Sequence, residues 1–571
     1  MKRFWLFLIL LIAALLTLAY ALRVARQNSA VAVSSLLPPD TIAFVHLPDF
    51  NRTRDEWHHS DIYQLFHEPA VEEFLRTPLA RFRKIDAASQ TVQEIERLAP
   101  KDSFFAVTSI DARNPGFVAG FRFRGSRDAA ETVVGKWRVY LAKKTSIAKH
   151  EKVAYRQHEI ELAAGPTFTL ATAYDGHWFF AANDVAKIKE LLDRADRHAD
   201  RQTALQSDKT YRTAMAHMPS DYAGLFYLQP KTIVEKLALL RTAMGQKIPP
   251  DQPAALEKIH CICGTMRFER GKIRDVLFTS IPEVATDLKL TRSSLSLGTT
   301  DTFLYLAALL DPQNLGALSQ AGGLIPVTGW LQKFLLLSSN NRITTDEWKA
   351  AFDLELAAVG DWPATAHWPS IILTLPVKDF ARANTVVDAL TTAIDEDARW
   401  VKVEKNGVAY FSMATPATFF AVTPTIALSD RRLVAGINSA SVEAAIKQSQ
   451  GPAMGLANSS SYNQATRSLH DPSSFFAYID TPLLYSRIDS ALRPMLLLGA
   501  AFLPALSDRV QLDKLPPPEV VTKHLSPIVS SQRYDRDGYV VESIGPITFN
   551  QATAALILTA IYLTVARQPS H

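Results

Sequence analysis

Four residues that could support acid–base chemistry gather in one stretch after the apolar N-terminus. The segment LLPPDTIAFVHLPDFNRTRDEW (Leu36–Trp57) places Asp40, His46, Asp49 and Arg52 around a β-like run. A histidine among carboxylates is a typical arrangement for proton transfer. Asp-Thr and Pro-Asp pairs, however, are ordinary turn formers at strand ends. The composition of this stretch therefore favours a structural role.

His260, Cys261 and Cys263 form the most metal-like cluster of the sequence. Residues two apart in a strand point to the same face, so both thiols could meet one ion. A structural zinc site needs about four ligands, and the chain has no second cysteine pair and no HxxxH motif. Cysteines this close also form a disulfide only with strain. We interpret both as core residues and expect no metal ligands.

A histidine-rich helical segment contains WHHSD (Trp57–Asp61) and His67. A solvated helix face is the favoured interpretation, and a partner contact or a weak metal site is the alternative. The chain has no GxSxG, HExxH, GxxxxGK[ST] or GxGxxG motif, so the standard hydrolase, zincin and nucleotide-binding signatures are absent. We expect no catalytic residue, no cofactor-binding residue and no cofactor.

The composition describes a globular protein of more than one domain. The 571 residues are 47% hydrophobic and 21% charged, with a net charge of +4 and two cysteines. No concentrated basic run is present, so nucleic acid is not an expected partner. With two cysteines, a disulfide-stapled fold is also excluded.

The N-terminus predicts a membrane anchor. Phe4 to Leu22 is uncharged, follows Lys2 and Arg3, and would span about 28 Å as a helix, close to the bilayer's hydrocarbon thickness. We expect residues 1–26 to be a signal anchor inserted in the lipid bilayer, with the body exported. Cleavage after Ala21 remains the alternative, because the residues before it have the small-x-small spacing of a signal-peptidase site.

A second apolar segment closes the chain at residues 547–566, Ile547 to Ala566. Its polar Asn550 and Gln551 lie near one end, where they could reach the membrane interface. A buried helix and a second membrane span are equally compatible with this composition. Two shorter Leu-rich segments, Gly323–Leu337 and Met495–Leu506, are too short to span and are expected to be buried helices or an exposed apolar surface.

The chain repeats itself at a separation of about 250 residues. Thr132-Val133-Val134 recurs as Thr385-Val386-Val387, and the helical stripe around it recurs with the same spacing. Further matches keep their order along the chain: Asp40 with Asp301, Tyr211 with Tyr462, Tyr227 with Tyr478, Pro250 with Pro516, and Arg267 with Arg533. His46 is not repeated, because Ala307 occupies the matching place. We interpret the pattern as a tandem duplication.

The predicted fold is α+β, with two tandem copies of an antiparallel sheet plus helices behind an N-terminal transmembrane helix. The copies are expected at residues 38–285 and 299–546, with helices on one face of each sheet. Alternation in GFVAGFRFRG predicts a strand, and Tyr174-Asp175-Gly176 predicts a hairpin turn.

The run LPPDTIAFVHLPDFNRTRDEW…YQLFHEPAVEEFL behind a hydrophobic N-terminus resembles an uncharacterised bacterial family. Its members are exported, N-terminally membrane-anchored proteins that contain a domain of unknown function. The resemblance is strongest over Leu37 to Leu75. It implies a bacterial cytoplasmic membrane location with the body on the periplasmic or extracytoplasmic side, and it assigns no site residue.

These observations favour a non-enzymatic envelope protein that presents a binding surface to another envelope component. A carrier or sensor of an apolar ligand is the alternative, and an enzyme of unknown class is third. A large apolar cavity would favour the carrier. A cluster of acids and histidine in one copy only would favour the enzyme, and a continuous exposed apolar patch would favour the scaffold.

Overall fold

The computed structural model describes most of the chain outside its two ends. The described residues are 32–80, 93–111, 115–145, 149–165, 169–196, 203–243, 258–281, 289–309, 343–392, 399–413, 422–450, 455–502 and 514–555. Two compact units divide the chain. The smaller unit comprises residues 1–50 and 94–213, and the larger unit comprises residues 51–93 and 214–571.

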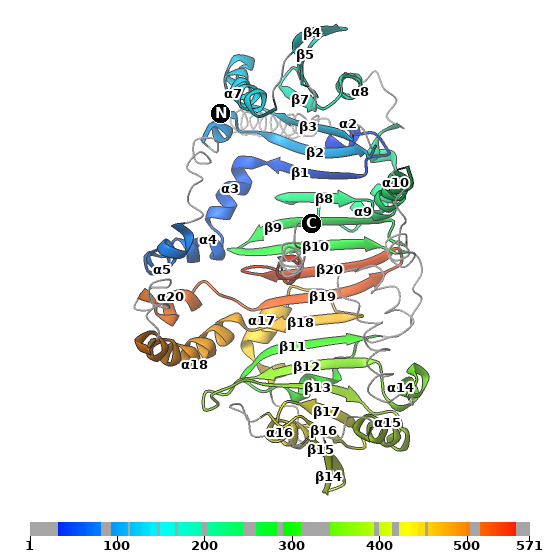
Figure 1. Cartoon of the computed structure of the whole chain (residues 1–571), viewed down its shortest axis with the longest axis vertical. Coiled ribbons are helices and arrows are strands. Elements are labelled where there is room, and N and C mark those ends of the chain that lie inside the picture. The colour runs from blue at the N-terminus through cyan, green and yellow to red at the C-terminus, as the bar shows by residue number, and fades with distance from the viewer. Residues whose placement is uncertain are drawn as a thin grey trace, which may run out of the picture. The chain divides into compact units, whose positions relative to one another are not determined.

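The smaller unit is built on an antiparallel sheet in which neighbouring strands are paired in the order β1-β2-β3-β7-β6-β5-β4 (Figure 1). Its strands are β1 (Ala43–Asp49), β2 (Lys101–Ser109), β3 (Gly116–Arg122), β4 (Lys149–Tyr155), β5 (His158–Ala164), β6 (Thr169–Asp175) and β7 (Trp178–Ala182). Its main helices are α7 (Arg127–Thr145) and α8 (Val185–Ala195), with short α2 (Val33–Leu36) before β1.

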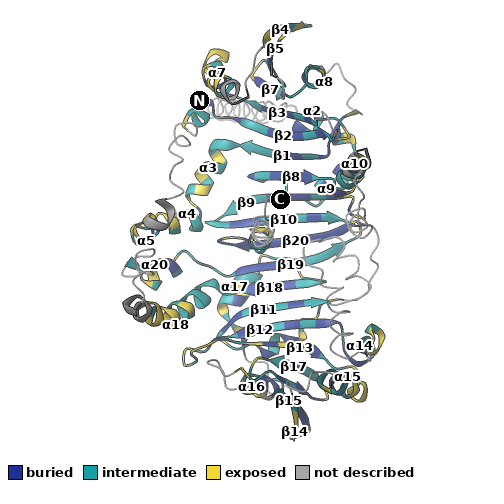
Figure 2. Cartoon of the chain, viewed as in Figure 1, coloured by how far each residue is buried: buried dark blue, intermediate teal, exposed yellow. Residues whose placement is uncertain are grey.

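The larger unit is built on a longer antiparallel sheet with the order β8-β9-β10-β20-β19-β18-β11-β12-β13-β17-β16-β15-β14. Its first strands are β8 (Gly224–Leu228), β9 (Cys261–Glu269) and β10 (Lys272–Ser280). The central strands are β11 (Thr302–Leu309), β12 (Glu355–Asp361), β13 (Ser370–Pro376), β18 (Phe475–Ile479), β19 (Ile528–Asp535) and β20 (Gly538–Gly545). The last strands are β14 (Trp400–Lys405), β15 (Val408–Met413), β16 (Thr425–Leu428) and β17 (Arg432–Gly436). Edge strand β14 is largely exposed (Figure 2).

Helices connect these strands. They include α3 (Phe50–His58), α4 (Asp61–Phe66), α5 (Pro69–Ala80), α9 (Lys209–Ala216), α10 (Pro230–Ala243), α14 (Thr345–Ala351), α15 (Phe380–Thr392), α16 (Ser439–Ser449), α17 (Ser460–Thr466), α18 (Thr481–Phe502) and α20 (Pro518–Thr522). Single 3₁₀ turns lie at η2 (Leu205–Ser207), η3 (Ser293–Leu297) and η4 (Leu456–Asn458). The α+β class with a large antiparallel sheet is thus confirmed.

The expectation of helices on only one face of the sheet is wrong. In the larger unit, Val434 packs into the core that contains Val442 of α16, whereas its neighbour Leu433 packs against the core that contains Val387 of α15. Successive strand residues point to opposite faces, so α16 and α15 cover opposite faces. The reason is that these strands are apolar on both sides, and each apolar face needs cover.

Several local predictions are confirmed. The strand predicted from GFVAGFRFRG is β3, and the hairpin at Tyr174-Asp175-Gly176 joins β6 to β7 with Gly176 at φ 54°. The first residues of the predicted helical stripe are buried in both places, with Ala130 and Val134 at 0% and 1% exposure and Ala383 and Val387 at 0% and 1%. The next residues of the stripe, Trp137 and Leu390, are partly buried. Periodicity identified these faces correctly because each helix buries one stripe.

The described start of the C-terminal apolar segment packs on the sheet of the larger unit. Thr548 caps the helix that follows: the Gln551 N–H donates to its Oγ1 at 3.1 Å. Asp275 of β10 accepts hydrogen bonds from the Thr548 hydroxyl and, at 2.9 Å, from Asn550 Nδ2. The polar residues expected to reach a membrane interface therefore bind protein groups.

No helix within the described residues is both long and apolar enough to cross a membrane. The predicted anchor Phe4–Leu22 and the segment Gly323–Leu337 lie outside the described residues, as does the chain after residue 555. The predicted boundaries 1–26, 38–285, 299–546 and 547–566 stay predictions.

Candidate functional site

The residues singled out near the N-terminus do not converge on one site. Asp40 is exposed before β1, and Asp49 forms an ion pair with Lys101 at 2.9 Å. His46 points to another neighbour, Asp102, with 3.8 Å between its Nε2 and Oδ1. These three lie in the smaller unit, whereas Arg52 belongs to the larger unit. Arg52 binds Glu56 Oε1 at 2.8 Å and Asp221 Oδ1 at 2.9 Å.

In the neighbourhood of His46, the negative charge of Asp102 is neutralised by a nearby arginine. Arg122 Nη2 donates to Asp102 Oδ2 at 2.6 Å. Burial raises the pKa of Asp102, but the nearby His46 and the hydrogen bonds and positive charge of Arg122 outweigh burial, so its pKa lies below the ordinary value. The carboxylate therefore stays ionised beside its cation, as expected of a structural ion pair rather than a general base.

The cysteine pair lies in the core. Cys261 and Cys263 are free thiols at 0% exposure, whereas His260 is exposed. Burial and the nearby Cys261 raise the pKa of Cys263 to about 12, so this thiol stays protonated. Among the described residues, neither thiol belongs to a group of side chains that could hold a metal ion.

The histidine-rich segment is a helix surface. The His59 Nδ1–H donates to the Asp55 carbonyl at 2.6 Å, and the His67 Nδ1–H donates to the Tyr63 carbonyl at 2.9 Å. The Tyr63 and His67 rings stack with centroids 3.9 Å apart. These are contacts within α3 and α4 and their ends, as a solvated helix face would make.

An apolar row crosses one face of the larger unit's sheet, and part of it is exposed. Leu306, Ala358, Leu373 and Ala435 are paired in register across β11, β12, β13 and β17. Directly paired residues share a face. Leu373 is 47% exposed, Ile371, two residues before it on β13, is 38% exposed, and Ile437, directly after the end of β17, is 47% exposed. We call these six residues the apolar row.

The apolar row shares its face with the start of the C-terminal helix. Through registered pairs, Leu306 lies beside Ala477, then Ser530, Ser543 and Asp275. At that end, Phe549 covers the face: its N–H donates to Ser543 Oγ at 2.8 Å and its ring lies 5.5 Å from that of Phe475. Phe549 therefore covers this face near Ser543 and Phe475, and α15 covers it at Leu375 and Leu433, whereas Leu373 between them is exposed.

The smaller unit has a similar row. Val45, Phe105, Ala119 and Ala181 are paired in register across β1, β2, β3 and β7. Val45 is 54% and Phe105 49% exposed, and Phe105 stacks on Phe117 with ring centroids 5.8 Å apart.

A hollow of about 800 Å³ lies between α7 and strands β4 to β6 in the smaller unit. Val139, Leu162, Ala163 and Leu170 supply apolar lining. Arg138 also lines it and is held by ion pairs with Glu131 and Glu161. This volume is in the range of small-molecule sites.

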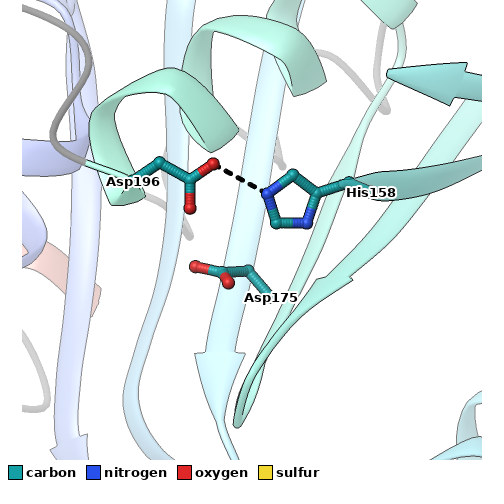
Figure 3. A group of neighbouring side chains, drawn as sticks. All are labelled: His158, Asp175 and Asp196. Carbon is teal, nitrogen blue, oxygen red and sulfur yellow. Dashed lines mark hydrogen bonds and ion pairs between the residues drawn. The ribbon is translucent and has the colours of Figure 1, made fainter. Parts of the chain in front are cut away.

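A metal-like cluster that the sequence interpretation missed lies elsewhere in the smaller unit. His158 begins β5, Asp175 ends β6 and Asp196 caps the C-terminus of α8 (Figure 3). One potential ligand atom from each lies within 4.8 Å of the other two. His158 Nε2 and Asp196 Oδ2 are 2.8 Å apart, and Gln157 Nε2 donates to the same oxygen at 2.9 Å. The cluster was missed because Asp175 was assigned only to its turn.

Burial and the neighbouring charges both act on the carboxyl group of Asp175. Burial raises the pKa of Asp175, the negative charge of Asp196 raises it further, and His158 lowers it. The side chains of His158 and Asp196 are only 6% and 10% exposed. The cluster thus combines a buried imidazole with two acids.

Comparison with solved structures finds only distant likeness. Two crystal forms of TP0453 match: "Structure of crystal form I of TP0453" at 6% identity and TM-score 0.24, covering 46% of this chain and 82% of that one, and crystal form III at 7% and 0.23, covering 44% and 81%. Scores this low do not establish a shared fold. A comparison with curated proteins finds no match.

A family model matches part of the second half of the chain, whereas the resemblance noted in the sequence was strongest at Leu37 to Leu75, in the first half. Residues 340–498 match the family described as "Protein of unknown function (DUF3352)", and this confirms the resemblance to an uncharacterised family with a domain of unknown function.

Proposed function

We propose that the protein is an exported, membrane-anchored, non-enzymatic scaffold of the cell envelope. In this proposal its α+β unit is duplicated, and it presents a binding surface to another envelope component. The apolar row on the larger unit is the observation that carries the proposal.

Duplication is supported by strand order. The order β1-β2-β3-β7-β6-β5-β4 in the smaller unit has the same form as β11-β12-β13-β17-β16-β15-β14 in the larger unit. The matched tyrosines agree with it, since Tyr211 and Tyr462 are 8% and 4% exposed, and Tyr227 and Tyr478 are 1% and 0% exposed. Large aromatic residues recur here because they fill equivalent core positions.

The exposure of apolar side chains in the apolar row supports a binding surface. Contiguous exposed apolar side chains cost solvation free energy, and on folded proteins they commonly mark interaction sites. Ile371 and Leu373 lie on one face of β13, and Ile437 directly follows β17, the strand that pairs with β13. An apolar protein surface from another envelope component is the occupant that we propose.

Site-specific photo-crosslinking tests this surface. A photoreactive residue at Leu373 in the full chain, in native membranes, should give a discrete protein adduct. Ala444, which is exposed on α16 and hence on the side opposite the row, is the matched control and should give none. Adducts with lipid alone at Leu373, or identical adducts from both positions, would contradict the proposal.

The membrane anchor requires its own test. The full chain should remain in the membrane pellet after alkaline carbonate extraction, and protease added to spheroplasts should digest its body. Recovery in the soluble fraction, or protection from protease, would refute the anchoring or the export.

The hollow beside α7 favours a second candidate, a carrier of an apolar ligand. Full-length protein purified in mild detergent should then retain a bound apolar molecule detectable by mass spectrometry. Leu162→Trp, which fills the hollow, should reduce its amount several-fold, whereas Leu373→Trp should not. If both variants retained equal amounts of the apolar molecule, this would contradict binding in the hollow.

A further inference from the structure

We propose that His158, Asp175 and Asp196 bind a divalent transition-metal ion such as Zn²⁺ in the smaller unit (Figure 3). This inference rests on the duplication proposed above for its comparison of the two units, and on no other part of the proposed function. It rests on the donor types, their spacing, their burial and the comparison with the matching elements of the larger unit.

The donor set suits such an ion. An imidazole nitrogen with two carboxylates favours a first-row transition metal, because Mg²⁺ and Ca²⁺ take oxygen ligands. Three protein ligands leave a coordination position open for water. Ligands about 2.1 Å from a tetrahedral zinc lie about 3.4 Å apart. The donors here, all within 4.8 Å of one another, need shifts of only about 1 Å to reach that spacing.

Three separate elements hold these donors in place. A tight hairpin between β4 and β5 holds His158. Tyr155, the last residue of β4, pairs in register with His158, the first residue of β5. Gly176 supports the tight turn directly after Asp175. The Asp196 N–H donates to the Leu192 carbonyl at 2.8 Å, which fixes the last turn of α8. A metal ion would therefore find side chains whose backbones are already positioned.

The matching elements of the larger unit have other residues at the places of His158, Asp175 and Asp196. There β15 begins at Val408, Ser429 follows β16, and Gln450 caps α16. Val408 is an ordinary core residue at 4% exposure. The fold itself can therefore be formed with an apolar side chain at the place of His158. Among the described residues this grouping of a buried histidine with two acids occurs in the smaller unit alone, which is consistent with a ligand.

The composition of the cluster also suits a cation. Asp175 and Asp196 lie within 4.8 Å of each other and share one histidine, and the hydrogen bonds to Asp196 come from His158 and Gln157. Two ionised carboxylates close together in a partly buried place repel each other. A dication would replace the bond between His158 and Asp196 and neutralise both acids.

Zinc binding to the full chain provides the test. The protein, purified in detergent and stripped of metal with a chelator, is titrated with ZnCl₂ by calorimetry, and far-ultraviolet circular dichroism checks each variant's fold. We expect one ion per chain, with binding weakened at least about tenfold in His158→Ala and Asp175→Asn, since even outer-shell changes cost that much. His177→Ala, which removes an exposed histidine in the same hairpin, is the matched control and should bind normally.

X-ray absorption spectroscopy at the zinc edge supplies a second measurement that does not depend on variants that fold well. It should report one imidazole nitrogen among oxygen neighbours. Absence of stoichiometric binding, or unchanged binding in both His158→Ala and Asp175→Asn, would overturn the proposal and leave His158 and Asp196 as a structural pair. A spectrum with several histidines would do the same.

Discussion

Asp275 should make the stability of the larger unit depend on pH in an unusual direction. Its carboxylate lies on β10 and accepts the hydroxyl of Thr548 and the amide of Asn550 at the start of the C-terminal helix. Burial raises its pKa from 3.8 to about 6, the nearby charge of Glu542 adds to the rise, and the two hydrogen bonds offset part of it. The folded state therefore binds this proton more tightly than the unfolded state does.

The sign and size follow from linkage. An acid with a raised folded-state pKa adds stability that is full below its unfolded pKa and is lost as the pH rises through the folded pKa. A shift from 3.8 to about 6 corresponds to at most about 3 kcal/mol at neutral pH. Between pH 5 and pH 7.5 the loss is about 1.4 kcal/mol, because about half of the total stabilisation is already lost by pH 5.

Asp275→Asn isolates this effect, because asparagine is neutral at every pH and keeps an oxygen for Thr548. The measurement is urea unfolding of the full chain in detergent at several pH values. Relative to wild type, the variant should gain about 1.4 kcal/mol between pH 5 and pH 7.5, whatever constant offset it has. Asp430→Asn, at an exposed aspartate of the same unit, should show no such trend. A flat difference for Asp275→Asn would refute the reasoning.

Three other substitutions test buried polar groups. Glu355, 4% exposed, accepts the N–H groups of Thr291, Arg292 and Ser293 at 2.7–2.9 Å, so Glu355→Gln should lower the free energy of unfolding by about 3 kcal/mol, measured by urea denaturation. Arg274→Met removes the arginine from the buried carboxylate of Glu542, leaves it His470 as a partner, and should cost about 3 kcal/mol, whereas the double variant with Glu542→Leu should recover much of it; an equal loss in both would contradict this. Asp102 has a lowered pKa, so its contribution is present above its ordinary pKa of about 4 and is lost as the pH falls. Asp102→Asn should therefore flatten the acid limb of the unfolding profile.

The periodic parts of the fold could be predicted from the sequence. The stripe through Ala383 and Val387 and the strand at Thr302–Leu309 follow from local spacing, which burial of one face enforces. The distribution of helices between the two faces could not. Val434 and Leu433 are both aliphatic, and only the strand order determines which helix covers each of them. That order depends on pairings between residues far apart in sequence, such as Thr374 with Val434.

The candidate sites were harder to predict, because ligand geometry has no local signature here. His158, Asp175 and Asp196 lie on three different elements and are separated by ordinary turn and helix residues. The conspicuous run at Asp40 to Arg52, by contrast, separates into individual ion pairs. Spacing along the chain was informative only where a single element carried all the residues involved.

Comparison between the two halves gives a sharper criterion than either half alone. In the proposed duplication, His46 and His158 both occupy places where the other half has an apolar residue, Ala307 and Val408. Near His46, Arg122 binds Asp102 at 2.6 Å, so one acid has its own arginine. Near His158, Asp175 and Asp196 share one histidine. A polar substitution balanced by its neighbours needs only the fold to explain it, whereas two carboxylates that share one histidine suit the metal ion proposed above. That imbalance distinguishes the metal hypothesis at His158 from the structural pair at His46.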